Sequence, residues 1–214
     1  MSRAKIMILA GGTGGHVIPG LTIAKALEDA KCDITWIGTK GGIEEKLVPK
    51  ANIKIEYITV MGLRGKSLMN VLIAVKQLIQ SIFQSINLLM KYRPDVVIGM
   101  GGYVSGPGGI AAFLLRYPLV IHEQNSVPGT TNKFLAKIAS SVLEAFPGSF
   151  RSNMNAKTIG NPIREEIALI EGPKKRLQDR NFVLFPLFEI QKNWKHPTKK
   201  TKIKDLIKKL EDSA

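Results

Sequence analysis

The amino-terminal sequence reads KIMILA at residues 5–10, GGTGGH at 11–16 and LTIAKALEDA at 21–30. The first segment is a short apolar run typical of a buried strand, and the third carries apolar residues at helical spacing. The glycines between them allow a tight backbone turn, because they have no Cβ atoms. This order of strand, glycine loop and helix predicts the beginning of a parallel α/β sheet.

The same unit repeats further along the chain. DVVIGM at 95–100 is another apolar strand, followed by the glycine segment GGYVSGPGG at 101–109 and a helix over 110–116. Further strands are predicted at 33–38, 53–60, 119–123, 141–145 and 157–159, and further helices at 42–51, 68–92 and 132–139. Strands that alternate with helices predict an α/β fold with a doubly wound, Rossmann-like parallel sheet.

The composition suits one substantial globular domain, or one domain with a piece of a second, because 214 residues contain 44% hydrophobic residues. The single Cys32 cannot form an intrachain disulfide, and residues 1–15 lack the features of a signal peptide, so we expect a cytoplasmic setting. The most apolar stretch, 68–90, contains too many polar residues for a membrane-spanning helix. We therefore expect no membrane crossing.

The net charge of +14 is unevenly distributed. Residues 1–172 hold 19 Lys and Arg against 12 Asp and Glu, whereas the much shorter segment 173–214 holds 12 against 5. We predict a domain over 1–172 and a basic, poorly ordered tail over 173–214, whose lysines repel one another. The tail could attract nucleic acid by charge, but no RNA or DNA module is recognised, so we expect no nucleic-acid partner.

Both glycine segments follow predicted strand ends, where open α/β sheets bind ligands. Backbone N–H groups beside a helix N-terminus can hold a diphosphate. GGTGGH fits neither GxGxxG nor GxxxxGK[ST], which excludes the standard dinucleotide and P-loop sites, while a diphosphate cradle and a simple turn both stay open. His16 directly follows this loop, as a structural hydrogen-bonding group or as a base, and Pro19 is expected in the first helical turn.

A polar segment, HEQN at 122–125, ends another predicted strand at the same edge. Glu123 and Asn125 are its better functional candidates, and the alternative is a polar strand exit before the turn at 128–129. No DxD or His/Cys/Asp cluster occurs, so neither a metal site nor a cofactor is predicted. Without a GxSxG motif, Ser105 is a poor hydrolase nucleophile.

The predicted helix over 68–92 has two interpretations. One side carries apolar residues that could pack on the core: Val71, Val75, Leu78, Ile82, Ile86 and Leu89. Leu72, Ile79 and Phe83 lie outside this stripe, and no acidic residue occurs from 57 to 94. The helix therefore packs on the sheet, docks on anionic lipid, or does both.

Five segments together resemble the MurG family of glycosyltransferases: GGTGGHVIPGL at 11–21, MGLRGK at 61–66, DVVIGMGGYVSGPGG at 95–109, HEQNSVPGTTNKFLAKIA at 122–139 and GNPIR at 160–164. The resemblance implies the N-terminal half of a GT-B fold. It also implies transfer of N-acetylglucosamine (GlcNAc) from UDP-GlcNAc to lipid I, which forms lipid II with inversion. The expected location is peripheral, on the cytoplasmic face of the bacterial inner membrane.

The resemblance also implies roles for single residues. The residues facing donor and acceptor are Thr13, Gly14 and Gly15, the donor contacts are Asn125 and Arg164, and the second phosphate loop contains Gly101, Gly102, Gly106, Gly108 and Gly109. His16 and Glu123 match catalytic groups near the acceptor hydroxyl, and which of them is the base stays open.

The sequence departs from the family pattern after Asn181. The family continues with a third glycine loop, whereas this chain continues with NFVLFPLFEIQKNWKHP. We expect the donor domain to be lost by truncation or frameshift, UDP-GlcNAc to bind weakly and activity alone to be low. The alternative is a non-catalytic domain that binds a polyprenyl diphosphate or a membrane.

Overall fold

The computed structural model describes residues 3–60 and 68–162, with side chains described from Ile73 onward in the second range. Three predictions lie outside the described residues: the MGLRGK segment at 61–66, the donor contact Arg164 and the basic tail over 173–214.

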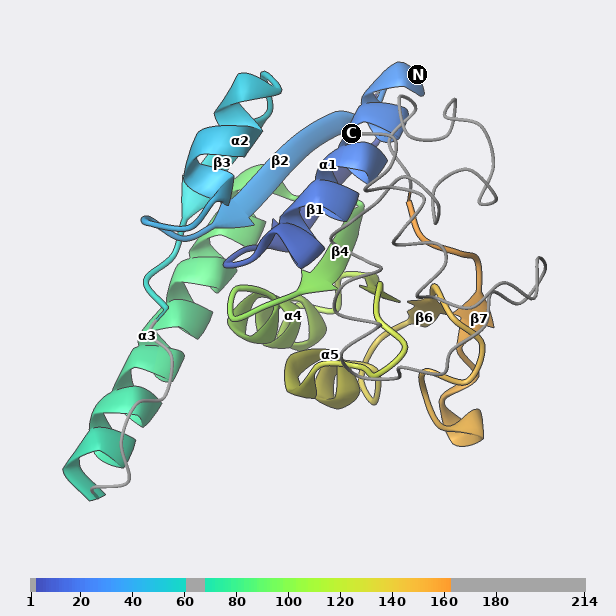
Figure 1. The fold of residues 1–214 in the computed structure, drawn as a ribbon. Coiled ribbons are helices and arrows are strands. Elements are labelled where there is room, and N and C mark those ends of the chain that lie inside the picture. Colours follow the sequence, from blue (N-terminus) through green and yellow to red (C-terminus); the bar gives the residue numbers. More distant parts are fainter. Residues whose placement is uncertain (1–2, 61–67, 163–214) are drawn as a thin grey trace, which may run out of the picture. The chain divides into compact units, whose positions relative to one another are not determined.

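The core of the fold is a seven-stranded sheet in which every strand pair is parallel (Figure 1). Its strands are β1 (Lys5–Ala10), β2 (Asp33–Gly38), β3 (Lys54–Tyr57), β4 (Val96–Gly101), β5 (Leu119–Glu123), β6 (Ser141–Glu144) and β7 (Lys157–Thr158). They lie in the order β3-β2-β1-β4-β5-β6-β7. This topology confirms the predicted doubly wound sheet.

Helices cover both faces of the sheet. They are α1 (Gly14–Asp29), α2 (Glu44–Lys50), α3 (Leu68–Tyr92), α4 (Ser105–Leu114) and α5 (Thr130–Leu135), with a 3-10 turn at Ser152–Met154. Alternate residues of β1 enter two separate cores, because successive strand side chains point to opposite faces. Met7 and Leu9 pack with the α3, α4 and α5 side, whereas Ile8 packs with the α1 and α2 side, around the buried Trp36.

Two helices begin five or more residues earlier than the sequence pattern predicted, and α5 begins two residues earlier, at Thr130. Helix α1 begins at Gly14 instead of residue 21, and α4 begins at Ser105 instead of residue 110. Pro19 is therefore the sixth residue of α1, and its predicted place in the first turn is wrong. Glycine is favoured inside α1 by close packing, because a Cβ atom on Gly20 would lie 2.7 Å from Cη2 of Trp36.

Helix α3 has the predicted bounds, but its amino-terminal part extends away from the sheet (Figure 1). A helix of 25 residues is about 37 Å long, whereas six-residue strands span only about 20 Å. Val75 and Leu78 are 49% and 45% exposed, so their predicted core positions are wrong. The buried stripe lies nearer the carboxyl end, at Ser81, Ser85 and Leu89.

Candidate functional site

A cavity of about 320 Å³ lies where the two glycine loops meet. The loops follow β1 and β4, which are neighbours although two strands separate them in sequence. In open α/β sheets, this reversal of strand order is where ligands bind, at the carboxyl ends of the strands. The cavity is lined by Gly11, Gly12, Thr13, His16, Gly101, Gly102, Tyr103, Gly129, Thr130, Thr131 and Asn132.

The first glycine loop is held by the fully buried carboxylate of Glu44. Gly12 has a positive φ of 92°, and its N–H donates to Oε2 of Glu44 at 3.0 Å. The N–H and hydroxyl of Thr39 donate to Oε1 at 3.0 and 2.8 Å. One carboxylate thereby joins the loops after β1 and β2.

Helix α1 begins directly at the cavity. Thr13 lines the cavity and is the N-cap residue, and Gly14 and Gly15 form the beginning of the helix. The first N–H groups of a helix have no partner inside it and carry a partial positive charge. No acidic residue occurs in this first turn, so the helix end can receive an anionic group.

The second loop places two glycines against His16. Gly101 and Gly102 have φ values of 104° and 81°, a region that side-chain-bearing residues rarely adopt. A Cβ atom on Gly101 would lie 2.8 Å from Nδ1 of His16, and one on Gly102 would lie 2.3 Å from the Gly11 carbonyl oxygen. The hydroxyl of Ser105 accepts from the Gly101 N–H at 3.0 Å and lies 2.8 Å from the Leu9 carbonyl, to which it donates.

The other glycines of this segment lie in α4 and not in a loop as predicted. Gly108 and Gly109 are buried inside the helix, and added Cβ atoms would lie 2.7 Å from Leu9 and Leu135 respectively. Gly106 is also helical and does not line the cavity. Gly108 and Gly109 allow α4 to approach the sheet and α5 closely, a need that sequence spacing does not distinguish from phosphate contact.

His16 is joined to a buried polar chain. Its Nδ1 lies 3.3 Å from Oε1 of Gln124, and Nε2 of Gln124 lies 3.2 Å from Nδ1 of His122. The Nε2 atom of His122 lies 3.2 Å from the Gly160 carbonyl oxygen. Burial lowers the pKa of His122, and the Gly160 bond and the Glu123 charge offset this only in part.

Gln124 was missed as a site residue, although the sequence held a signal for it. Residues two apart in a strand share a face, so His122 and Gln124 point to one side while Glu123 points to the other. A polar pair on one face at the end of a buried strand favours a further polar partner on that side, which here is His16, in contact with Gln124.

Glu123 is fully buried and does not line the cavity. Its Oε1 accepts from the N–H and Nδ2 of Asn125 at 3.0 and 2.9 Å, and its Oε2 accepts from the Gly129 N–H at 3.1 Å and Nδ2 of Asn132 at 2.9 Å. With two donors on each oxygen, this carboxylate fixes the loop after β5. The geometry argues against Glu123 as the base.

Asn132 lines the cavity and was also missed. Its Nδ2 donates to Glu123 and to the His122 carbonyl, which leaves Oδ1 as the one buried side-chain polar atom without a hydrogen-bond partner among the described residues. Such an unpaired acceptor is rare inside folded proteins, and here it belongs to a residue of the cavity lining. The available signal was a polar residue in the first turn of a helix that follows a strand end.

Asn125 is exposed beside the cavity and is not part of its lining. Its backbone carbonyl accepts from the Ser149 hydroxyl at 3.1 Å, so its orientation is fixed by the loops after β5 and β6. Within the described residues, no group of three or more His, Cys, Asp or Glu side chains is arranged to hold a metal.

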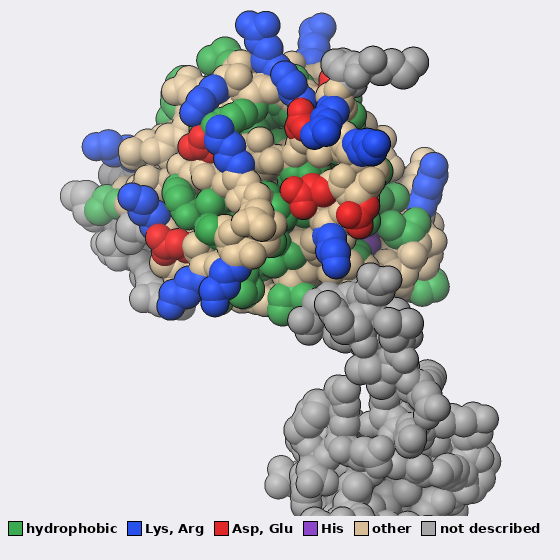
Figure 2. Space-filling model, turned by 90° about the horizontal axis from the view of Figure 1, so that it is seen from above, with side chains coloured by type: hydrophobic (Ala, Val, Ile, Leu, Met, Phe, Trp, Pro, Cys, Tyr) green, Lys and Arg blue, Asp and Glu red, His purple; other side chains and the backbone are tan. Residues whose placement is uncertain are grey.

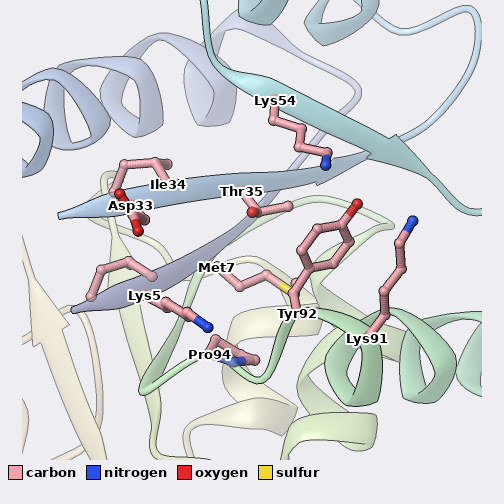
Figure 3. Close-up of a pocket in the computed structure, with 10 residues that line it drawn as sticks. Lys5, Met7, Asp33, Ile34, Thr35, Lys54, Lys91, Tyr92 and Pro94 are labelled. Atoms are coloured by element: carbon pink, nitrogen blue, oxygen red, sulfur yellow. The ribbon is translucent and has the colours of Figure 1, made fainter. Parts of the chain in front are cut away.

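A second cavity, of about 340 Å³, lies at the opposite edge, where β1 and β2 begin (Figure 3). Tyr92 stands between Lys54 and Lys91, whose Nζ atoms lie 4.8 and 4.9 Å from its ring centre. Glu56 accepts from the Tyr92 hydroxyl and from Nζ of Lys91, and the Tyr92 bond is the main cause of its lowered pKa. Glu56 is thus hydrogen-bonded to both Tyr92 and Lys91. The glycine loops lie at the opposite edge of the sheet.

The charged side chains on one face of the domain do not form a single basic patch. On the face shown in Figure 2, Lys and Arg side chains are spread widely, with Asp and Glu side chains among them.

Comparisons with known sequences agree with this geometry. Residues 6–144 match the glycosyltransferase family 28 N-terminal domain. The chain is 49% identical over 178 residues to UDP-N-acetylglucosamine--N-acetylmuramyl-(pentapeptide) pyrophosphoryl-undecaprenol N-acetylglucosamine transferase of Proteus mirabilis, and 51% identical over 177 residues to that of Vibrio cholerae. Each match covers 83% of this chain and 49% of the relative, so the chain spans about half the length of these relatives.

Solved structures give the same relationship. MurG of Acinetobacter baumannii superposes with a TM-score of 0.65 at 40% identity, over 73% of this chain and 45% of that one. UDP-GlcNAc 2-epimerase of Methanocaldococcus jannaschii, at 15% identity and a TM-score of 0.55 over 99% of this chain and 70% of that one, shares the fold. The predicted resemblance is confirmed, and the chain belongs to glycosyltransferase family 28, whose N-terminal domain it contains.

Proposed function

We propose that this chain supplies the acceptor-binding half of a GlcNAc transferase that converts lipid I to lipid II. The observation that supports the proposal is the cavity at the beginning of α1, where His16 lies beside the second glycine loop. The names of the relatives specify the donor, UDP-GlcNAc, and the acceptor, a muramoyl-pentapeptide on a polyprenyl diphosphate. A diphosphate fits the helix end, since that end is positive and free of acidic residues.

In the proposed reaction, His16 acts as the base. The acceptor 4-hydroxyl gives its proton to the imidazole while its oxygen attacks the anomeric carbon of GlcNAc. The bond from that carbon to the diphosphate oxygen of UDP breaks, and the configuration inverts. Glu123 positions the loop after β5, because its two oxygens are occupied by four donors.

The test is GlcNAc transfer to lipid I in detergent, by the chain alone and by the chain mixed with the separately expressed C-terminal half of the Proteus mirabilis relative. We expect little transfer alone, transfer in the mixture, and a loss of about 10²- to 10⁴-fold with His16→Asn. Lys25→Ala, on the exposed side of α1, is the matched control. Lipid I binding without transfer in either sample would favour the alternative of a non-catalytic binding domain.

Donor binding gives an independent measurement. We propose that UDP-GlcNAc binds the chain weakly, because the chain spans about half of its relatives and only the first-loop residues and Asn125 are described among the proposed donor contacts. Lost contacts cannot be replaced by a loop alone. Calorimetric titration that gives micromolar, uridine-dependent affinity would contradict this expectation.

We further propose that α3 docks the chain on an anionic membrane surface. Exposed apolar side chains occur along the helix at Ile73, Val75, Leu78, Ile79, Phe83 and Met90, and Phe83 is 62% exposed. The span from 57 to 94 has no acidic residue. No described helix is long and apolar enough to cross a bilayer. The exposed apolar side chains of α3 support peripheral attachment instead. We place this attachment on the cytoplasmic face, the side that holds UDP-GlcNAc.

Flotation with phosphatidylglycerol vesicles tests this docking. Phe83→Asp removes an exposed apolar group and adds a charge, so binding should fall several-fold. Gln80→Asp adds the same charge at another exposed position of the helix and should weaken binding much less. Equal losses in both variants would show that charge alone holds the protein to the vesicle, and the apolar docking role would fail.

A further inference from the structure

The side-chain amide of Gln124 connects the two histidines of the domain. Gln124 is only 5% exposed, and its two amide ends point to different partners. Oε1 lies 3.3 Å from Nδ1 of His16, and Nε2 lies 3.2 Å from Nδ1 of His122. A buried amide between two imidazoles limits where the protons of both rings can be.

The orientation of the amide follows from its surroundings. Nε2 of Gln124 also lies 3.1 Å from the carbonyl oxygen of His122. A carbonyl oxygen only accepts, so the amide end that faces it must be the NH₂ group. The oxygen end must therefore face His16.

The protonation of His122 follows in the same way. Its Nε2 lies 3.2 Å from the carbonyl oxygen of Gly160, so Nε2 must carry a proton and donate. Burial favours the neutral ring, whose Nδ1 then has a free lone pair. This lone pair accepts the second proton of the Gln124 NH₂ group, and it holds the amide in the orientation just described.

These constraints leave one arrangement for His16. Its Nδ1 faces an oxygen that can only accept, so Nδ1 carries the proton, and Nε2 of the neutral ring is unprotonated. The ring cannot slide away from this contact easily, because Gly101 and Gly102 pack beside it. No hydrogen bond to Nε2 is formed by the described residues, and His16 is part of the cavity lining.

We infer that Gln124 is a positioning residue that fixes the tautomer of His16 with a bare Nε2, and that His122 sets the orientation of the Gln124 amide. The catalytic consequence rests on the proposed function, because a base must present an unprotonated nitrogen to the acceptor hydroxyl. The tautomer itself is a property of the free chain and can be measured without substrate.

Long-range ¹H–¹⁵N spectra of the whole chain at mildly alkaline pH report the tautomer directly. The chain has three histidines, and loss of one set of signals in His16→Asn assigns His16. We expect a pyrrole-type Nδ1 and a pyridine-type Nε2 for His16. A protonated Nε2 in the unaltered chain would overturn the inference.

Two substitutions of Gln124 separate positioning from packing. Gln124→Leu removes the acceptor, so the His16 signals should shift toward a mixture of both tautomers. Gln124→Glu keeps an acceptor for His16 and removes the NH₂ donor to His122, so the His16 tautomer should persist while the His122 signals change. Equal behaviour of the two variants at His16 would contradict the inference. If the leucine variant does not fold, the test rests on the glutamate variant, in which the His16 tautomer must persist while the His122 signals change.

The reconstituted transfer assay completes the test. Gln124→Leu should lower kcat by about 10²-fold with little change in KM for lipid I, because a wrongly protonated base impairs chemistry more than binding. An unchanged kcat together with the expected tautomer change would refute His16 as the base but not the tautomer. The expected tautomer shift with a parallel loss of kcat supports both.

Discussion

The two edges of the sheet use carboxylates in different ways. At the carboxyl edge, Glu44, Glu123 and Glu144 are buried, and each accepts backbone N–H groups from loops. Nearer the surface, Asp33 at the beginning of β2 and Glu56 on β3 pair with the cationic side chains of Arg3 and Lys91, and Asp95 accepts from the Lys5 N–H at an exposed position. Buried carboxylates therefore hold the loops of the carboxyl edge in place, whereas those nearer the surface mainly balance charge.

This difference explains why the site is at the carboxyl edge. A buried carboxylate with backbone donors orders the loops without adding free charge to the cavity. Glu44 orders the loop after β1, and Glu123 orders the loop after β5. The cavity beside these loops is then left with helix N–H groups and His16, a combination suited to an anionic, proton-donating substrate.

The largest effect should come from Glu44. Glu44→Ala removes a buried carboxylate and leaves the N–H of Gly12 and both donors of Thr39 without their acceptor in a part-buried place, so we expect a loss of about 3 kcal/mol in the free energy of unfolding. Its neighbour Glu45 is exposed and, among the described residues, accepts from the Gly41 N–H alone, so Glu45→Ala should cost less than about 1 kcal/mol. Urea unfolding of both variants measures this, and similar losses would remove the distinction between buried and exposed carboxylates.

Glu144 should show the next effect, and it should depend on pH. Burial raises the pKa of this carboxyl, but the hydrogen bonds from Phe150 N–H, Thr158 hydroxyl and Gly148 N–H outweigh burial and lower it below the ordinary 4.5. A lowered pKa stabilises the fold fully above the unfolded value, and this stability is lost as the pH falls through the folded value. We expect Glu144→Gln to cost about 2 kcal/mol at neutral pH.

The measurement for Glu144 is a pair of pH series. The difference in unfolding free energy between the unaltered chain and Glu144→Gln should be constant near neutrality and should shrink below about pH 4.5. A difference that grows on acidification would mean that the folded pKa is raised, and the assigned loop role would be wrong.

Alanine substitutions at two glycines of α4 should change the free energy of unfolding less, and in opposite directions. Gly108→Ala places a Cβ atom 2.7 Å from Cδ1 of Leu9, so overpacking should outweigh the helix propensity of Ala and cost about 1 kcal/mol. At Gly106 the nearest atom is Cγ2 of Thr131 at 3.7 Å, so Gly106→Ala should stabilise by about 0.5 kcal/mol. Thermal unfolding distinguishes the two variants. If both instead lose lipid I binding equally at unchanged stability, the phosphate-loop assignment would be restored.

The sequence predicted the sheet because the strand signal is local. Apolar runs at 5–10, 33–38 and 119–123 coincide with β1, β2 and β5, and the long helix has the predicted bounds. Helix beginnings were missed at Gly14 and Ser105, since glycines are typical of loops, whereas Gly20, Gly108 and Gly109 serve close packing that only the folded neighbours create.

The sequence predicted only part of the cavity lining. His16, Thr13 and the two loop glycines Gly101 and Gly102 line the cavity, and they were recognisable because a glycine loop at a strand end is a local pattern. Glu44 was missed, because its donor Gly12 lies 32 residues away and a buried glutamate looks like a surface one in sequence. Gln124 was quoted in a motif but not chosen, since its role depends on His16, which is 108 residues distant.

The smallest effect is expected at the amino edge. Nη1 of Arg3 lies 3.6 Å from Oδ1 of Asp33, and the two side chains are 65% and 54% exposed. Water screens such a pair and both side chains lose rotamer freedom on pairing, so Arg3→Ala should change the free energy of unfolding by less than about 0.5 kcal/mol. Asp33→Asn breaks the same pair from the other side and should agree within about the same margin. A loss from either substitution as large as that from Glu44→Ala would show that the amino edge also depends on its carboxylates, and burial would no longer explain the contrast between the edges.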